Sequence, residues 1–583
     1  MLNIGDFKEN LVGYDCYRLL NTNTIWMNEA EADNIEKVLN SSLSPESFAN
    51  FFSYVPQKNR CFDAASLDLR DHRVYEAERY GGGGVGDNGG GGRVGNYANF
   101  QVKGAGPNPV TNSSTTWYSY GSLNLVDAAY EAIFSTILND LLPLGCAKIY
   151  GIIFTSKTGA FHSVNGAAQD AQLTPASGAL LVREPTLRPA HFMRADVFTP
   201  AKSSNLMRDS NRVRIVNKRL REKFAGDNDF IRYLGKFLLS SAKQMSFALA
   251  ARITHGALTA SNMCLDGRWI DLTEARFLSG GKNFTGLNAF YDDPKIPAYV
   301  LSELAYIFGK SNVVNFNLAP LMAYYQRVFD SCFAYYGLGI LGLPSAELTE
   351  IAEGDDGKLV ARAFFSVITR HKKSLSDVDD VPDPEDPVID FMRSLYRSLP
   401  NDGAGASALE AALSPSDLDA GAVAAAFERV FLKSIAASDG NGAAATRSKR
   451  IACAIKALRW AYLSSFFYKK RLISHLYYLS HQEAPARVGE FIAECIGYAK
   501  WIFSTATSGS VPLLETAAVR VSFEESQHIY VVAADERREF SRYADCLEFM
   551  ANRYPGASMS GNFDPSFYLN GIHQVLTGLE SDA

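Results

Sequence analysis

The sequence predicts an α+β fold, with strands and one helix in the first third of the chain and helices over most of the remainder. Residues 123–142 carry apolar side chains at helical spacing and stop at Pro143. Short apolar or alternating runs on either side of this helix are typical of strands: residues 99–103, 148–155 and 178–183. From about Asp227 onward, long amphipathic runs predict a mainly helical region.

Segments of biased composition interrupt the helical part of the chain. Helices are expected over residues 230–253, 296–336 and 451–503. Residues 374–387 are acidic and proline-rich, which is typical of a loop, and residues 401–447 predict short helices between loops. The expected organisation is an N-terminal extension (1–75), a strand-rich lobe (76–200), a helical lobe (201–375), a linker-rich segment (376–447) and a helical C-terminal region (448–583).

The composition of this 583-residue chain is that of an ordinary globular protein. Hydrophobic residues make up 47% and charged residues 21%, and the net charge of −6 argues against a global basic surface for nucleic acid. The cysteines form no CxxC pair, which argues against zinc-ribbon and thioredoxin-type motifs. The N-terminus has no basic segment followed by an apolar run, and no apolar stretch is long enough to span a membrane. We therefore expect a cytoplasmic protein that binds neither nucleic acid nor a membrane.

A glycine-rich segment and a lysine follow one another before the first predicted helix. In residues 80–93 (YGGGGVGDNGGGGR), glycine would let backbone N–H groups approach an anion closely, although the same composition also fits a flexible linker. Lys103 ends a predicted strand and precedes a Gly-Ala-Gly step. A lone lysine there is usually a surface charge. Paired with Glu131, in the middle of the predicted helix, it would instead be fixed onto nucleotide phosphates.

Four further residues fit a nucleoside triphosphate and its metal ion. Arg183 and Arg188 flank a turn that contains Pro185, and the planar guanidinium group suits bidentate phosphate contacts, although ordinary salt bridges would also explain them. Asn262 and Asp271 carry the hard oxygen ligands that Mg²⁺ takes, although an Asn and an Asp also occur near turns by chance. Taken in chain order, these signals are those of a protein-kinase-like phosphotransfer site for ATP.

A longer set of short motifs keeps a fixed order between residues 75 and 285. The most specific are Lys103-Gly104-Ala105-Gly106 and the series His255-Gly256, Asn262-Met263 and Asp271. The others are Tyr80-Gly81-Gly82, Gly90-Gly91-Gly92-Arg93, Gly121, Glu131, residues 178–183, Leu187-Arg188 and His191-Phe192. In these motifs the chain resembles the selenoprotein O family of kinase-like protein adenylyltransferases (AMPylases).

The resemblance implies a bilobal, protein-kinase-like fold in which ATP binds in a flipped orientation. It implies transfer of AMP onto Ser, Thr or Tyr hydroxyls of a protein or peptide, with release of pyrophosphate and with Mg²⁺ or Mn²⁺ as the metal. Lys103 would hold phosphate and pair with Glu131, and Asn262 and Asp271 would bind the metal that accompanies ATP. The remaining nucleotide contacts implied by the motifs are Gly90, Gly92, Arg93, Gly121, Arg183 and Arg188.

Three positions depart from the family pattern. Ser261 stands at the catalytic position where the family has an Asp, taken as the proton acceptor, and serine alone is no general base near neutral pH. Tyr120 and Gly91 replace two further acids, and Asp266 and Glu274 are candidate substitutes for the missing base. The departures leave two alternatives open. One is a catalytically impaired pseudokinase that binds ATP and acts as a scaffold, and the other is a related ATP-dependent transferase that modifies peptides.

Overall fold

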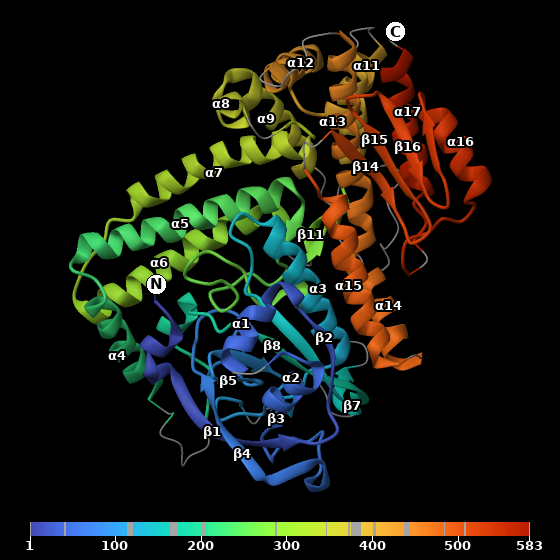
Figure 1. The fold of residues 1–583 in the computed structure, drawn as a ribbon. Helices are drawn as coiled ribbons and strands as arrows, with labels where there is room; N and C mark the ends of the chain where they lie inside the picture. Colours follow the sequence, from blue (N-terminus) through green and yellow to red (C-terminus); the bar gives the residue numbers. More distant parts are fainter. Residues whose placement is uncertain are drawn as a thin grey trace.

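The computed structural model describes residues 2–39, 42–112, 120–163, 173–200, 206, 208–280, 282–285, 288–344, 347–370, 373–374, 386–399, 404–436, 443–482, 484–505, 509–561 and 563–581. The fold is α+β, as predicted: a large antiparallel sheet is built from the first third of the chain, and helices form most of the remainder (Figure 1). None of the helices in these ranges is long and apolar enough to cross a membrane.

Eight strands form the large sheet in the order β2-β7-β8-β6-β5-β4-β1-β3, and neighbouring strands are antiparallel. Their bounds are β1 (Leu11–Leu19), β2 (Asn23–Met27), β3 (Tyr54–Val55), β4 (Leu67–Glu78), β5 (Val94–Tyr97), β6 (Phe100–Lys103), β7 (Ile149–Ser163) and β8 (Leu173–Arg183). The register places Gln101 of β6 opposite Arg183 of β8. Because alternate residues of a strand share a face, Lys103 lies on the same face of the sheet as Gln101.

On that face lies α3 (Leu125–Leu141), the helix predicted over residues 123–142. Asn124 caps its N-terminus by accepting a hydrogen bond from the backbone N–H of Asp127 (2.7 Å). Most residues of α3 are buried, because the sheet covers one side and the C-terminal helices α14 (Lys469–Gln482) and α15 (Pro485–Ile502) cover another (Figure 1).

Two short helices, α1 (Ala32–Leu39) and α2 (Pro45–Phe52), precede the third strand. The predicted helix over 230–253 is confirmed as α5, and the predicted 451–503 region as α13 to α15, whereas the 296–336 run is divided into α6 and α7. The helices not yet bounded are α4 (Asp209–Glu222), α5 (Asp227–Ala250), α6 (Ile296–Asn312), α7 (Ala319–Ile340), α8 (Leu348–Glu353), α9 (Asp355–Thr369), α10 (Pro387–Arg397), α11 (Ala404–Leu413), α12 (Ala420–Ala436), α13 (Ala443–Leu463), α16 (Tyr543–Arg553) and α17 (Ser566–Ser581).

Three smaller sheets accompany the helices. β9 (Ile253–Thr254) pairs with β10 (Arg276–Phe277), and β11 (Lys282–Thr285) pairs with β12 (Asn288–Ala289) and β13 (Lys373–Ser374). The third sheet has four antiparallel strands near the C-terminus: β14 (Ser510–Glu515), β15 (Arg520–Glu524), β16 (Ile529–Ala533) and β17 (Arg537–Phe540).

The largest hydrophobic core joins the sheet, the central helices and the C-terminal region. Its buried members run from Ile4 to Leu579 and include residues of α3, α5, α13 and α15. A smaller cluster, around Phe48, Phe52 and Tyr75, fills the space between the sheet and α1 and α2. The C-terminal region therefore packs as part of the same body as the sheet.

The structure corrects the predicted domain boundaries. β4 continues through residue 75, and β1 to β3 belong to the same sheet, so residues 1–75 are not a separate extension. α13 continues through residue 447, and β14–β17 lie in a region expected to be helical. Pairing between strands distant in the sequence leaves little trace in local composition, which explains these errors. Most of the predicted 374–387 loop lies outside the described residues.

Candidate nucleotide and metal site

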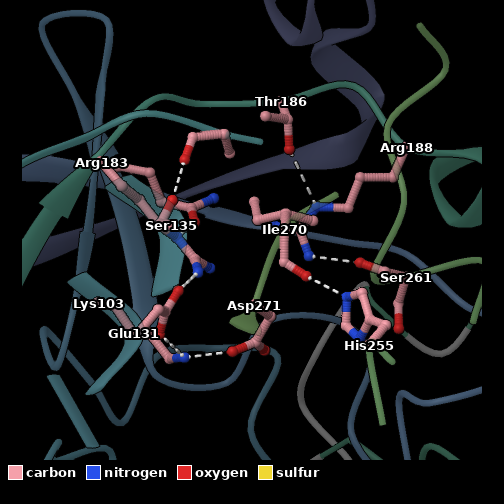
Figure 2. A network of polar contacts seen from close by, with 12 residues as sticks. Lys103, Glu131, Ser135, Arg183, Thr186, Arg188, His255, Ser261, Ile270 and Asp271 are labelled. Carbon is pink, nitrogen blue, oxygen red and sulfur yellow. Dashed lines mark hydrogen bonds and ion pairs between the residues drawn. The ribbon is translucent and has the colours of Figure 1, made fainter. Parts of the chain in front are cut away.

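Three predicted residues meet at one point between the sheet and the chain that follows α5. Lys103, at the end of β6, donates from Nζ to Oε2 of Glu131 on α3 (2.6 Å) and to Oδ1 of Asp271 (2.5 Å). Figure 2 shows Lys103 between the two carboxylates. The side chains of Lys103 and Glu131 are 2% and 1% exposed, whereas that of Asp271 is 30% exposed. Asp271 is therefore the member of the cluster that solvent or a ligand can reach.

Arg183 holds the second oxygen of Glu131. Its Nη1 donates to Glu131 Oε1 (2.5 Å), and its Nε donates to the side-chain oxygen of Gln101 (2.6 Å). The pairing of β6 with β8 sets Gln101 opposite Arg183, so the sheet itself presents the arginine to α3. With a cation on each carboxylate oxygen, Glu131 is held in one orientation and in turn orients Lys103. The direct phosphate contact expected of Arg183 stays a prediction.

Asp271 has a backbone conformation that few non-glycine residues adopt. Its φ of 64° lies in the left-handed region, which Asp tolerates better than most residues and which recurs at functional sites. Burial raises the pKa of its carboxyl group, but the positive charges of Lys103, Arg183 and Arg93 outweigh burial and hold that pKa well below its usual range. Asp271 is therefore ionised at neutral pH, as a metal ligand must be.

The two predicted metal ligands lie at the ends of one short hairpin. The backbone N–H of Ile270, next to Asp271, donates to the carbonyl oxygen of Asn262 (3.2 Å). Within the hairpin, Met263 pairs with Trp269. This pairing places Asn262 opposite Ile270, the residue next to Asp271 in the chain. A metal site shared by the Asn262 and Asp271 side chains stays a prediction.

Side-chain hydrogen bonds fix the loop that precedes the hairpin. Asn262 donates from Nδ2 to the carbonyl oxygen of Ala257 (2.8 Å), and its Oδ1 lies 3.4 Å from the hydroxyl oxygen of Ser261. This orientation leaves Oδ1 with capacity for a cation. The buried His255 pairs through Nε2 with the carbonyl oxygen of Ile270 (3.0 Å). Burial lowers the pKa of His255, so the ring is neutral and Nε2 carries the proton that it donates.

The glycines expected to contact the nucleotide are packed against neighbouring backbone or side chains. A Cβ at Gly90 would lie 1.9 Å from a carbonyl oxygen of β4, and a Cβ at Gly121 would lie 2.0 Å from the carbonyl carbon of Gly106. Both residues also have positive φ, 151° and 77°. A Cβ at Gly92 would lie 2.9 Å from Oγ1 of Thr111. At Gly90 and Gly121 the backbone contacts and the positive φ alone require glycine, and at Gly92 the Thr111 side chain disfavours a larger residue. Contact of Gly90, Gly92 and Gly121 with ATP stays a prediction.

Behind the site, Glu78 at the end of β4 is the centre of a buried polar network. Its carboxylate oxygens lie 2.5–3.5 Å from the side-chain nitrogens of Arg188, His191, Asn96 and Gln101. Burial raises the pKa of Glu78, but Arg188 and His191 outweigh it and lower that pKa to about 2.

Arg188, expected to hold phosphate, is buried in this network. Its Nη1 donates to the carbonyl oxygen of Ser261 (2.9 Å), and its guanidinium group lies 5.0 Å from the centre of the Tyr80 ring. Arg188 therefore ties the loop of Ser261 to Glu78 and to the start of the glycine-rich segment. Its contact with phosphate stays a prediction.

The Ser261 side chain, at the expected base position, is engaged by its surroundings. Its hydroxyl donates to the carbonyl oxygen of Gly83 in the glycine-rich segment (3.2 Å) and shares a hydrogen bond with the Thr259 hydroxyl (2.9 Å). These contacts tie the glycine-rich segment to the loop before Asn262. They supply no carboxylate or imidazole that would turn Ser261 into a base.

The two candidate substitute acids also have cationic partners. Asp266, at the tip of the hairpin, pairs with Arg268 (2.8 Å). Glu274 pairs with Arg276 (2.9 Å) and with Lys469 of α14 (2.7 Å). Both carboxylates are partly exposed, and none of these ion pairs involves the Asn262 side chain. Their role as substitute bases stays a prediction.

The donor set fits Mg²⁺ or Mn²⁺ held jointly by protein and nucleotide. Asp271 contributes an ionised carboxylate and Asn262 an amide oxygen. Across the described ranges, no group of three or more His, Cys, Asp and Glu side chains forms a complete metal site. Mg²⁺ commonly takes one or two protein ligands and completes its octahedron with phosphate oxygens and water, so a donor set of two protein residues is compatible with such a metal.

Three residues that shape the site received no role from sequence reasoning. Gln101 is linked to it through its hydrogen bond with Arg183, and Glu78 through its hydrogen bond with Gln101; both contacts depend on strand pairing, for which a single sequence has no signal. For His255 the His-Gly motif is a signal in the sequence, but it does not predict the hydrogen bond of His255 with the carbonyl oxygen of Ile270, next to Asp271.

The chain matches none of the protein-family models with which it was compared, and no curated protein matches its sequence. The interpretation of the site therefore depends on its geometry. The feature that any functional assignment must explain is the cluster of Lys103, Glu131 and Asp271 beside Asn262.

Proposed function

We propose that this protein is an ATP- and Mg²⁺-dependent nucleotidyltransferase with a bilobal, protein-kinase-like fold. It would move AMP from ATP onto a Ser, Thr or Tyr hydroxyl of a protein or peptide. The observation that carries the proposal is the cluster in which Lys103 of a strand contacts both Glu131 of a helix and Asp271. A kinase-like site uses such a lysine–glutamate pair to place the lysine on phosphates, and an Asp with an Asn to hold the metal.

In the proposed reaction each residue has a separate task. The acceptor oxygen forms a bond to the α-phosphorus of ATP, the bond between the α-phosphorus and the bridging oxygen to the β-phosphate breaks, and pyrophosphate leaves. Lys103, oriented by Glu131, supplies positive charge to the phosphates, and Arg93 adds its charge beside Asp271. A metal bound by Asp271 and Asn262 would neutralise further phosphate charge. The acceptor proton passes to water or to a phosphate oxygen, because Ser261 is not a base.

The lack of a base lowers the expected rate without removing the reaction. Transfer at phosphorus passes through a loose transition state, in which positioning and charge neutralisation dominate. A general base typically contributes about 10²–10⁴-fold. The Ser261 hydroxyl, at the position where a base is expected, is hydrogen-bonded to the carbonyl oxygen of Gly83. This contact favours a second candidate function, a pseudokinase that binds ATP and acts as a scaffold.

The Asp271→Ala variant tests the assignment. We expect an AMP-sized mass increase on the protein or an added acceptor after incubation with ATP and Mg²⁺ or Mn²⁺, and a loss of at least about a hundredfold in the variant because the ionised metal ligand is gone. Intact-protein and peptide mass spectrometry measures the adduct. Asp140→Ala, which removes an exposed acid at the end of α3, is the matched control and should retain the adduct.

The other outcomes distinguish the alternatives. A phosphate-sized adduct would indicate phosphoryl transfer in place of AMP transfer. ATP binding without any adduct would favour the scaffold, and AMP release that requires a peptide carboxylate would favour a peptide-modifying transferase. Equal adduct formation by wild-type protein and Asp271→Ala would refute the assigned site.

A further inference from the structure

The C-terminal helices contact both elements that position the site. α14 and α15 lie alongside α3, which carries Glu131 (Figure 1). The short 3-10 turn Ser464–Phe467, just before α14, contacts β10, which follows Asp271 in the chain. Residues 464–503 therefore touch the helix behind Lys103 and the segment beyond Asp271 at the same time.

Lys469, the first residue of α14, joins these elements at one point. Its Nζ lies 2.7 Å from Oε2 of Glu274 and 5.6 Å from the centre of the Tyr130 ring on α3. The Tyr130 hydroxyl donates to the carbonyl oxygen of Ala275 (2.6 Å), so the ring under the lysine is itself tied to the segment after Asp271. The Lys469 side chain is 22% exposed and that of Glu274 is 48% exposed, which places the pair at the edge of the packed region.

A cluster of aromatic rings forms a second connection between these elements. Phe277 of β10 is stacked on Phe503, with 5.1 Å between ring centroids and 7° between ring planes. Its ring also lies 5.8 Å from that of Phe467 and 6.0 Å from that of Phe134 on α3. Because close-packed rings transmit displacement, a shift of residues 464–503 moves both α3 and β10.

We propose that residues 464–503 form a built-in brace of the nucleotide site, in which Lys469 is a positioning residue that holds α3 and residues 272–278 together. The brace sets where Glu131 and Asp271 stand on either side of Lys103. The effect of the brace on catalysis rests on the proposed function. Its effect on the positions of α3 and residues 272–278 does not depend on any nucleotide.

The test compares Lys469→Met and Glu274→Gln with Lys470→Met in the full-length chain. Lys470 is the exposed neighbour of Lys469 on α14, so its replacement removes the same charge and leaves the brace intact. Hydrogen exchange of the nucleotide-free protein reports on the brace directly. We expect exchange of amides in α3 and in residues 272–278 to increase about fivefold in Lys469→Met and Glu274→Gln, and to stay unchanged in Lys470→Met.

Turnover gives a second readout. In Lys469→Met the kcat for AMP transfer should fall about fivefold, because Glu131 and Asp271 lose their relative position. Lys469→Arg, which keeps a cation over Tyr130 and a partner for Glu274, should recover most of the loss.

The outcomes separate the brace from the proposed function. Unchanged exchange in both Lys469→Met and Glu274→Gln would overturn the brace, whatever the wild-type activity. If Lys469→Met fails to fold, Glu274→Gln decides, because the half-exposed Glu274 side chain can be replaced without opening the core. A wild-type protein that binds no ATP would overturn the proposed function, and the exchange result would then decide the brace alone.

Discussion

The carboxylate of Glu78 is fully buried, yet it stays ionised because its interactions with neighbouring side chains stabilise the charged form by more than burial destabilises it. Arg188 and His191 contact one oxygen, and amide groups of Asn96 and Gln101 donate to the other. Breaking such a pair is more costly than never forming it, because the partner left behind is a buried, uncompensated charge. Glu78 therefore links the stability of the fold to the position of Arg188 beside Ser261.

Replacement of Glu78 by Gln should make unfolding less sensitive to acid. The folded-state pKa of Glu78 is about 2, below the ordinary value of 4.5, so its contribution to stability is present above about pH 4.5 and is lost as pH falls toward 2. The shift corresponds to about 3 kcal/mol of the free energy of unfolding. Glu78→Gln should lose about 3–5 kcal/mol at pH 7 and show a shallower decline below pH 4.5.

Urea denaturation at pH 7, 4 and 3 measures both effects in the wild-type protein and in the variant. His191, whose pKa burial lowers, contributes a further loss of stability in acid, so the comparison depends on the difference in slope between the two proteins. Equal slopes below pH 4.5 would contradict the assignment of the low pKa to Glu78.

Some individual residues of the candidate site can be predicted from the sequence, and others cannot. Lys103, Glu131 and Asp271 were selected by their chain order and residue types, and the structure brings them together. Arg183 and Arg188 are predicted to hold phosphate, which stays a prediction, and the structure shows in addition that they orient Glu131 and the Ser261 loop from buried positions. An arginine near a site has the same appearance in a sequence whether it contacts a ligand or a carboxylate behind it.

At the scale of elements, α3 begins where Asn124 joins the helix to the sheet. The Asn124 side chain caps the helix, and the backbone of the preceding residue accepts a hydrogen bond from Ala179 of β8 (2.9 Å). Because α3 carries Glu131, a frayed start would loosen the contact with Lys103. The cap thus serves the site as well as the helix.

Asn124→Ala should destabilise the protein by about 1 kcal/mol, because the backbone N–H of Asp127 loses its side-chain acceptor. Asn124→Ser, which keeps an acceptor oxygen, should lose much less. Urea denaturation of both variants measures the difference in the free energy of unfolding. Equal stability of the Ala and Ser variants would show that packing alone fixes the start of α3.

Elements were predicted well where a single stretch of sequence determines them. The apolar spacing of residues 123–142 predicts α3 within two residues at its start and one at its end. β14–β17 were missed because strands of four to six residues gain most of their stability from partners on other strands. The N-terminal strands were missed for the same reason: β2 pairs with β7, far along the chain.

At the scale of the whole molecule, Arg459 of α13 shows how the C-terminal region is joined. It is buried, and its guanidinium group donates to the carbonyl oxygens of Ile502 (2.9 Å), Ser504 (2.5 Å) and Pro512. One side chain thus connects α13 with the end of α15 and with β14. Burial lowers its pKa to about 10, which still leaves it charged at neutral pH.

Because the largest core runs from Ile4 to Leu579, we expect the chain to unfold in one cooperative transition. Arg459→Leu leaves three carbonyl oxygens without their donor, which should cost about 3–5 kcal/mol. Differential scanning calorimetry should show the whole transition shifted down by a few degrees, and Asn124→Ala, at the opposite end of the core, should shift the same transition by less. Arg553→Leu, at the exposed end of α16, is the control and should leave Tm unchanged. Two resolved transitions, of which Arg459→Leu moves only one, would show that the C-terminal region folds independently of the sheet. A region that unfolds separately from the site could not brace it.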